Sequence, residues 1–73
     1  MAEAFPQRLR RMRLRRGMTQ SHLADICYVH IRSIQDYEKG RGYPSAEVLC
    51  SMADALGVSV DYILCRTDNP ITL

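Results

Sequence analysis

Apolar residues recur at every third or fourth position along most of this chain, the spacing that places side chains on one face of an α-helix. Phe5, Leu9 and Met12 form the first such stripe, and Thr19 and Ser45 stand where later helices would need an N-cap. The predicted helices cover residues 6–16, 19–27, 30–39, 45–56 and 59–64. Because no stretch alternates as a strand would, the pattern predicts an all-α fold.

The whole chain, residues 1–73, is expected to form a single domain, since chains usually divide into domains only at much greater length. The helices end near residue 64, and residues 65–73 are expected to form a short C-terminal tail with a turn at Asp68-Asn69-Pro70. A domain this small needs very regular helix packing or a partner subunit to be stable.

Several classes of protein are excluded by what the sequence lacks. Cys27, Cys50 and Cys65 form no C-x-x-C pair, so we expect no zinc site or disulfide but reduced thiols in a cytosolic protein. No apolar run reaches the length of a membrane span, and no signal peptide is recognisable. We find no nucleotide loop, metal-ligand cluster or nucleophile–base group, which predicts a non-enzymatic protein without a cofactor.

The net charge is only +2, but six arginines fall between residues 8 and 16. Such a cluster can meet phosphates, although a solvated helix face gives the same pattern. We expect Arg8 and Arg11 to approach backbone phosphates, and Arg10, Arg15 and Arg16 to keep the surface soluble.

The second and third predicted helices are short and are separated by only a few residues, Cys27 to Val29. The small side chain of Ala24 allows the two helices to approach closely, and Val29 would fill the angle between them. A rigid corner of this kind is typical of a helix-turn-helix, which holds its second helix outward.

Four segments occur in order at characteristic spacings: "MTQSHLA", "YEKG", "YPSAEVL" and "ALGVSVDYIL". With them, residues 6–64 resemble the Cro/CI-type (XRE-family) helix-turn-helix domain of phage repressors and bacterial regulators. The resemblance implies a compact five-helix, lambda-repressor-like fold in which the third helix enters the major groove of double-stranded DNA.

The resemblance also implies roles for individual residues. Base readers would be Ile31, Arg32, Gln35 and Asp36, phosphate contacts would be Gln20, Ser33, Lys39, Gly40 and Arg41, and Arg13 would form a structural ion pair with Glu38. Helical geometry agrees for the third helix, because inward-facing Ile34 and Tyr37 place positions 31, 32, 35, 36 and 39 on the opposite face.

Two residues depart from the family pattern at the corner. Tyr28 replaces the usual glycine, so either the turn is strained by about 1 kcal/mol or it takes another shape. His30 replaces the usual Ser or Thr cap of the third helix, and we expect histidine to cap poorly.

These observations favour a sequence-specific transcriptional regulator, with repression the expected mode, located in the cytoplasm on the nucleoid and not in a membrane. A homodimer is expected because one recognition helix reads too few base pairs. Its contact would use the fifth helix and tail, around Val60, Tyr62, Ile63 and residues 65–73. The alternative is a protein-interaction module on the same fold, such as an antitoxin or a subunit of a regulatory complex.

Overall fold

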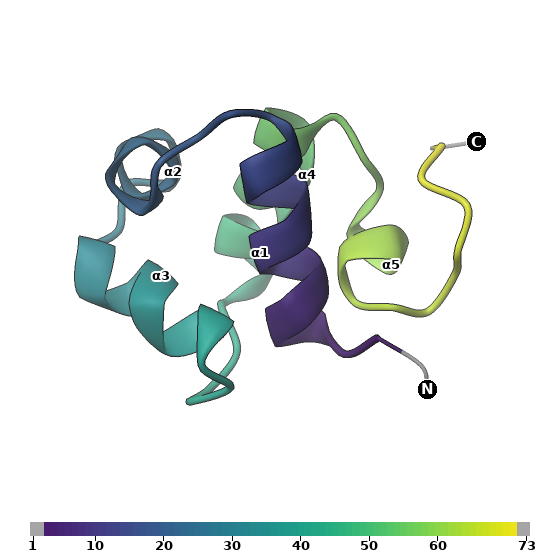
Figure 1. Ribbon diagram of the computed structural model, residues 1–73, viewed down its shortest axis with the longest axis horizontal. Coiled ribbons are helices and arrows are strands. Elements are labelled where there is room, and N and C mark those ends of the chain that lie inside the picture. The colour runs from purple at the N-terminus through teal and green to yellow at the C-terminus, as the bar shows by residue number, and fades with distance from the viewer. Residues whose placement is uncertain (1–2, 72–73) are drawn as a thin grey trace.

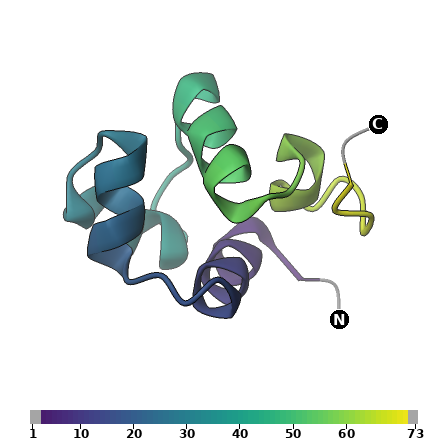
Figure 2. The ribbon, with the colours of Figure 1, turned by 90° about the horizontal axis from the view of Figure 1, so that it is seen from above.

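The computed structural model describes residues 3–71, which form five helices and, within that range, no strand. The helices are α1 (Phe5–Arg15), α2 (Gln20–Cys27), α3 (Ile31–Glu38), α4 (Ala46–Leu56) and α5 (Val60–Ile63). Helix α1 runs through the middle, with α2 and α3 at one end of the molecule and α5 with the tail at the other (Figures 1 and 2). The predicted all-α fold is confirmed.

Side-chain caps begin three of the helices where the sequence predicts them. Thr19 Oγ1 accepts the His22 amide at 3.0 Å, Ser45 Oγ accepts the Val48 amide at 3.3 Å, and Ser59 Oγ accepts the Tyr62 amide at 3.0 Å. Each cap satisfies an amide that has no partner within its helix, which fixes where the helix starts.

All five helices contribute to one core. Its largest fully buried side chains are Leu9, Leu23, Ile34, Met52, Leu56 and Ile63. Helix α1 packs against α3 and α5, while α4 packs against α2 and α5. The contact of α3 with α1 and that of α2 with α4 therefore hold α2 and α3 in position. Among residues 3–71, no helix is long and apolar enough to cross a membrane.

Arg8 is buried and links the N-terminal segment and the C-terminal tail to α5. The prediction that it approaches DNA phosphates is therefore wrong. Its guanidinium donates to the carbonyls of Tyr62 (3.0 Å) and Thr67 (2.9 Å), pairs with Glu3 and Asp68, and lies 4.3 Å over the Tyr62 ring. The reason is periodicity: position 8 lies one turn from Phe5, on the stripe that faces the interior.

Arg11 is likewise held within the molecule. It donates to both Glu3 oxygens and, at 3.1 Å, to the hydroxyl of Tyr62. Hydrogen bonds from Arg11 and Arg8 lower the pKa of Glu3 from 4.5 to about 2. The expected approach of Arg11 to DNA is therefore also unsupported, because its guanidinium is hydrogen-bonded to the N-terminal segment and to α5.

The surface predicted for dimer contact is smaller than expected. Tyr62 and Ile63 belong to the core, because the short α5 turns them toward α1 and α4, and Val60 is half-buried. The tail folds back onto α5, with the Ser59 amide donating to the Pro70 carbonyl at 3.0 Å. The last two residues of the predicted contact, 72 and 73, lie outside the described residues.

Candidate nucleic-acid interface

A tight corner joins α2 to α3. Tyr28 adopts the left-handed conformation, with φ 56° and ψ 41°, and the Val29 amide donates to the Ala24 carbonyl at 3.0 Å. This bond closes a Schellman-type helix end, which usually has glycine at the left-handed position. The turn therefore keeps the shape that glycine normally provides, and of the two outcomes expected for Tyr28 the strained one is found. Its side chain is 95% exposed and contributes nothing to the core.

His30 caps α3, which corrects the expectation that it would cap poorly. Its Nδ1 accepts the Arg32 amide at 3.0 Å. In a neutral imidazole with the proton on Nε2, Nδ1 is an acceptor, and it is separated from Cα by the same number of bonds as the side-chain oxygen of asparagine. Nδ1 of His30 thus takes the place of the side-chain oxygen of a favoured cap residue, and this bond fixes the start of α3.

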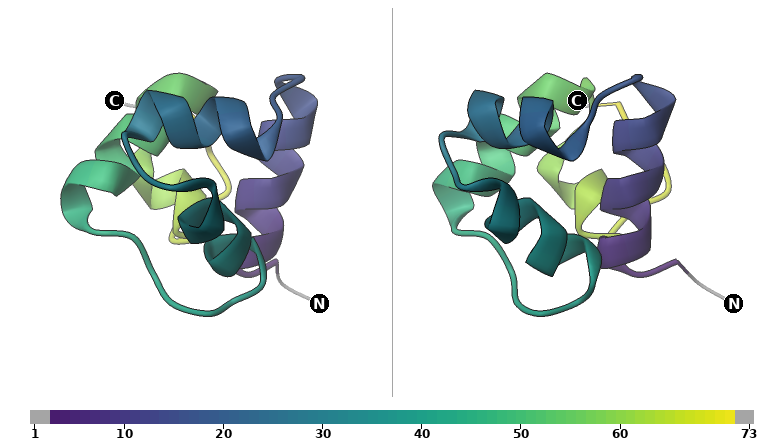
Figure 3. Two further views of the ribbon diagram at one scale, coloured as in Figure 1. Left: turned by 90° about the vertical axis from the view of Figure 1, so that its left-hand side faces the viewer. Right: turned by 60° about the vertical axis from the view of Figure 1, so that its left-hand side comes forward.

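Helices α2 and α3 lie in front when the left-hand side of Figure 1 is turned toward the viewer (Figure 3). The Arg32 side chain is 71% exposed, and Lys39 is also exposed, whereas Gln35 and Ser33 are half-buried. Ile31 was expected on the solvent-exposed face of α3, but it is half-buried and packs against the core. Only part of Ile31 is left for a contact outside the molecule.

Asp36 lies between two arginines. Its Oδ1 is 3.6 Å from Arg32 Nε, one helical turn earlier, and 3.9 Å from Arg41 Nη1 in the following loop. The Asp36 carbonyl also accepts the Arg41 amide at 2.8 Å. The carboxylate predicted to read a base is thus the counter-ion of both neighbouring guanidinium groups.

The segment after α3 turns sharply at Gly40, whose φ is +78°. Its amide, predicted to contact a phosphate, donates to the Tyr37 carbonyl at 3.2 Å. Gly40 therefore serves the end of the helix in this structure, and the positive charges of this segment are the exposed side chains of Lys39 and Arg41.

Beneath this surface, Arg13 ties α1 to α3. Its Nε and Nη2 donate to the two Glu38 oxygens at 2.7 and 3.0 Å, and its Nη1 donates to the Met18 carbonyl at 2.8 Å. Gln20 joins the pair, with Nε2 donating to Glu38 Oε1 at 3.3 Å. The adjacent carboxylate raises the pKa of Arg13, and the two side chains are only 8% and 4% exposed. The expected ion pair is therefore present and links three helices.

A family model described as helix-turn-helix matches residues 9–63, which is most of the chain and includes the corner and the Arg13–Glu38 pair. The chain belongs to the helix-turn-helix family. Helices α2 and α3, joined by the tight turn at Tyr28, have the arrangement of such a motif.

Two curated helix-turn-helix relatives are similar over 60 residues, or 82% of this chain. The transcriptional activator BcrR of Enterococcus faecalis is 33% identical, and the cryptic phage CTXphi transcriptional repressor RstR of Vibrio cholerae is 37% identical. The matched segment spans 29% of the first relative and 54% of the second, so these relatives extend well beyond it.

Solved structures of the P22 c2 repressor share the same helix-turn-helix fold. Its DNA-binding domain in solution gives a TM-score of 0.81 at 26% identity, over 88% of this chain and 84% of that one. The same repressor in complex with a synthetic operator gives 0.82 at 27% identity, over 85% and 94%. The predicted resemblance to phage repressors is confirmed.

Sequence reasoning missed the Asp36 counter-ion and the bond from Gln20 to Glu38. A signal for the first was available, because Arg32 and Asp36 are four residues apart on one helix and opposite charges at that spacing attract. No local pattern indicates the second, since Gln20 and Glu38 meet only when the helix-turn-helix corner has formed.

Proposed function

We propose that this chain is a sequence-specific DNA-binding transcriptional regulator, with repression the favoured mode, that reads the major groove with α3. The observation that carries the proposal is the outer face of α3, where Arg32 and Gln35 stand on a helix held by a rigid corner. An arginine can donate two hydrogen bonds to guanine, and a glutamine can pair with adenine in the same way. We assign the chain no catalytic role, and such a regulator would act in the cytoplasm on the nucleoid.

Phosphate contacts would surround this reading face. Lys39 and Arg41 supply positive charge at the end of α3, Gln20 has an amide at the start of α2, and Ser33 has a hydroxyl on α3. An α-helix with its side chains is about 10–12 Å across, so α3 can enter a major groove about 12 Å wide. The solved structure of the P22 c2 repressor in complex with a synthetic operator supports this role.

A homodimer remains part of the proposal, because one short helix specifies too few base pairs. Two half-sites roughly 34 Å apart would give a pseudo-palindromic operator. With Tyr62 and Ile63 in the core, the contact would have to use Val60 and the exposed part of the tail. Sedimentation of the full chain alone and on a duplex with two half-sites tests this: a single copy per duplex would contradict the dimer.

The test of base reading is selection of binding sites from random duplexes, repeated with Arg32→Ala and Gln35→Ala. Each change should flatten the preference at one position per half-site and weaken specific binding by about 1–3 kcal/mol. Arg10→Ala is a matched control, because Arg10 is an exposed arginine on α1, outside both the proposed reading face and the proposed dimer contact. Equal effects of Arg32→Ala and Arg10→Ala would show that only net charge matters.

A protein-interaction module is the second candidate, favoured by the exposed apolar side chains of Leu14 and Tyr28. The two functions differ in their response to salt. For a DNA-binding protein, log K falls linearly as log salt concentration rises, and each phosphate that the protein neutralises makes this slope steeper by about 0.9. No enrichment of any sequence, together with binding insensitive to salt, would favour the interaction module over the regulator.

A further inference from the structure

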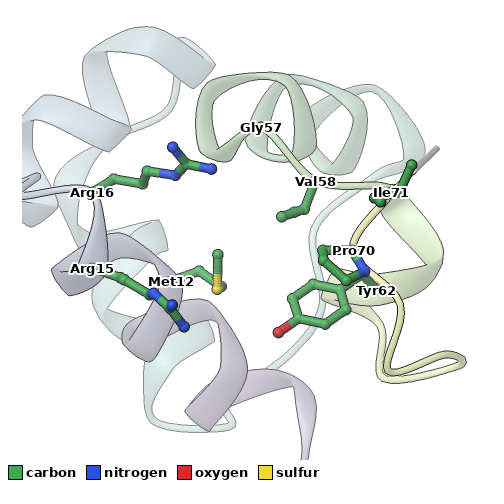
Figure 4. Close-up of a pocket in the computed structure, with 8 residues that line it drawn as sticks. All are labelled: Met12, Arg15, Arg16, Gly57, Val58, Tyr62, Pro70 and Ile71. Carbon is green, nitrogen blue, oxygen red and sulfur yellow. The ribbon is translucent and has the colours of Figure 1, made fainter.

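A cavity of about 410 Å³ lies between the end of α1, the loop from α4 to α5, and the C-terminal tail (Figure 4). The residues that line it are Met12, Arg15, Arg16, Gly57, Val58, Tyr62, Pro70 and Ile71. Its size falls within the range of small-molecule sites. It adjoins α5 and the tail, at the opposite end of the molecule from α3 (Figure 1), so the proposed DNA interface does not use it.

Two guanidinium groups at one side of this cavity have no acidic partner. Among residues 3–71, neither Arg15 nor Arg16 forms an ion pair, and no carboxylate lines the cavity. Arg16 extends toward Gly57 (Figure 4), and a Cβ added there would lie 2.9 Å from Arg16 Nη2. Glycine at position 57 therefore leaves room for this guanidinium, beside the C-terminal end of α4, whose partial negative charge favours a cation.

The remaining walls are apolar. Met12, Val58 and Tyr62 belong to the core and expose only a small part of their surface to the cavity, and Ile71 adds an exposed side chain from the tail. The tail is held in place by the bond from Ser59 to Pro70 and by Arg8 donating to the Thr67 carbonyl. The wall it provides is thus attached to the fold at two points.

We propose that this cavity binds a small amphipathic carboxylate, with the carboxylate on Arg15 and Arg16 and an apolar chain or ring against Met12, Val58 and Ile71. Guanidinium groups bind carboxylates through charge-assisted hydrogen bonds. A compact inorganic anion would leave the apolar walls uncovered, and a neutral apolar molecule would leave both guanidinium groups without a counter-charge. The combination of walls therefore selects a ligand that has both parts.

The test is calorimetric titration of the full chain with octanoate, butyrate, acetate and octanol. Octanoate should saturate one site, and affinity should rise by about fourfold for each methylene added beyond acetate. The double variant Arg15→Gln/Arg16→Gln should bind octanoate at least about tenfold more weakly, since it loses both charge-assisted contacts. The matched control Arg10→Gln/Arg66→Gln removes two exposed arginines that do not line the cavity, and its affinity should stay within about twofold of the parent.

Four outcomes would overturn the proposal: no saturable binding of octanoate, equal binding of acetate (an adventitious ion only), equal binding of octanol, or equal weakening in the two double variants. Thermal unfolding of both variants shows whether they are folded, so a loss of binding cannot be confused with a loss of structure. Arg32→Ala, which impairs the proposed DNA reading, should bind octanoate as the parent does. Failure of the ligand proposal is therefore distinguishable from failure of the proposed function.

Discussion

Removal of one partner of the Arg13–Glu38 pair is the most direct test of how α3 is held. Arg13→Met keeps most of the aliphatic length of the side chain but deletes the guanidinium, which donates to Glu38 at 2.7 and 3.0 Å and to the Met18 carbonyl at 2.8 Å. The Glu38 side chain, which is 4% exposed in the parent, would then keep only the 3.3 Å hydrogen bond from Gln20. A buried carboxylate with so little compensation is strongly unfavourable.

The expected loss is about 3–5 kcal/mol, the range found when one partner of a buried pair is removed. A domain of this size changes its Tm by at least about 4 °C per kcal/mol, so a drop of at least roughly 12 °C is expected. Glu38→Leu should cost a similar amount, since it leaves the guanidinium of Arg13 stranded instead. The double variant Arg13→Met/Glu38→Leu should recover most of the loss, because a buried pair replaced by apolar residues is often neutral in stability.

Urea unfolding followed by far-ultraviolet circular dichroism measures all four proteins on one scale. These four proteins form a double-mutant cycle, and the coupling energy between Arg13 and Glu38 should be at least about 2 kcal/mol. It should change little between 50 and 500 mM salt, because buried pairs are weakly screened. Arg66→Met/Asp61→Leu provides the exposed counterpart, with an expected coupling below about 1 kcal/mol. Single variants at Arg13 and Glu38 that each cost less than about 1 kcal/mol would refute the reasoning.

Four further predictions concern single side chains. Tyr28→Gly should raise the free energy of unfolding by about 1 kcal/mol by relieving the left-handed strain, whereas Tyr28→Ala should not, and urea unfolding compares them. His30→Ala should cost about 1 kcal/mol by removing the cap, and His30→Asn should restore it; equal stability of the two variants would contradict the capping bond. Glu3→Gln should flatten the loss of stability in acid: the pKa of Glu3 is lowered to about 2 in the folded chain, so its contribution is present above about pH 4.5 and is lost as the pH falls toward 2. Asp36→Ala should tighten binding to random duplex DNA and reduce the ratio of specific to non-specific affinity, because it frees Arg32 and Arg41 from their counter-ion; an unchanged ratio in competition binding would contradict this role.

Most of the fold could be predicted because its determinants are local. Apolar spacing identifies each helix, and the caps at Thr19, Ser45 and Ser59 need only a hydroxyl at the right distance from an amide. The errors occurred where a side chain's surroundings depend on another element. Arg8 looked like part of a basic surface cluster, although its place one turn after Phe5 already put it on the inward stripe.

The errors around α3 have a different cause. The inward direction of Ile34 was predictable from helical spacing, but Ile31 lies at the edge of that stripe, where the position of α2 decides how much of it is covered. The cap by His30 was missed because preference scales rank residue types and do not consider which ring nitrogen carries the proton. The orientation of Asp36 depends on Arg41, which approaches it only when the chain turns at Gly40.

Gln20 connects the buried pair to the surface proposed for DNA. Its amide carries two N–H groups, and the hydrogen bond to Glu38 at 3.3 Å uses one of them. The other remains for an acceptor outside the molecule, so a phosphate contact does not require the bond to Glu38 to break. Glu38 is also the last residue of α3. A Gln20 side chain bonded to Glu38 and to a phosphate at the same time would therefore align the DNA backbone with α3. The ion pair that stabilises the fold would then also set the position from which Arg32 and Gln35 reach the bases.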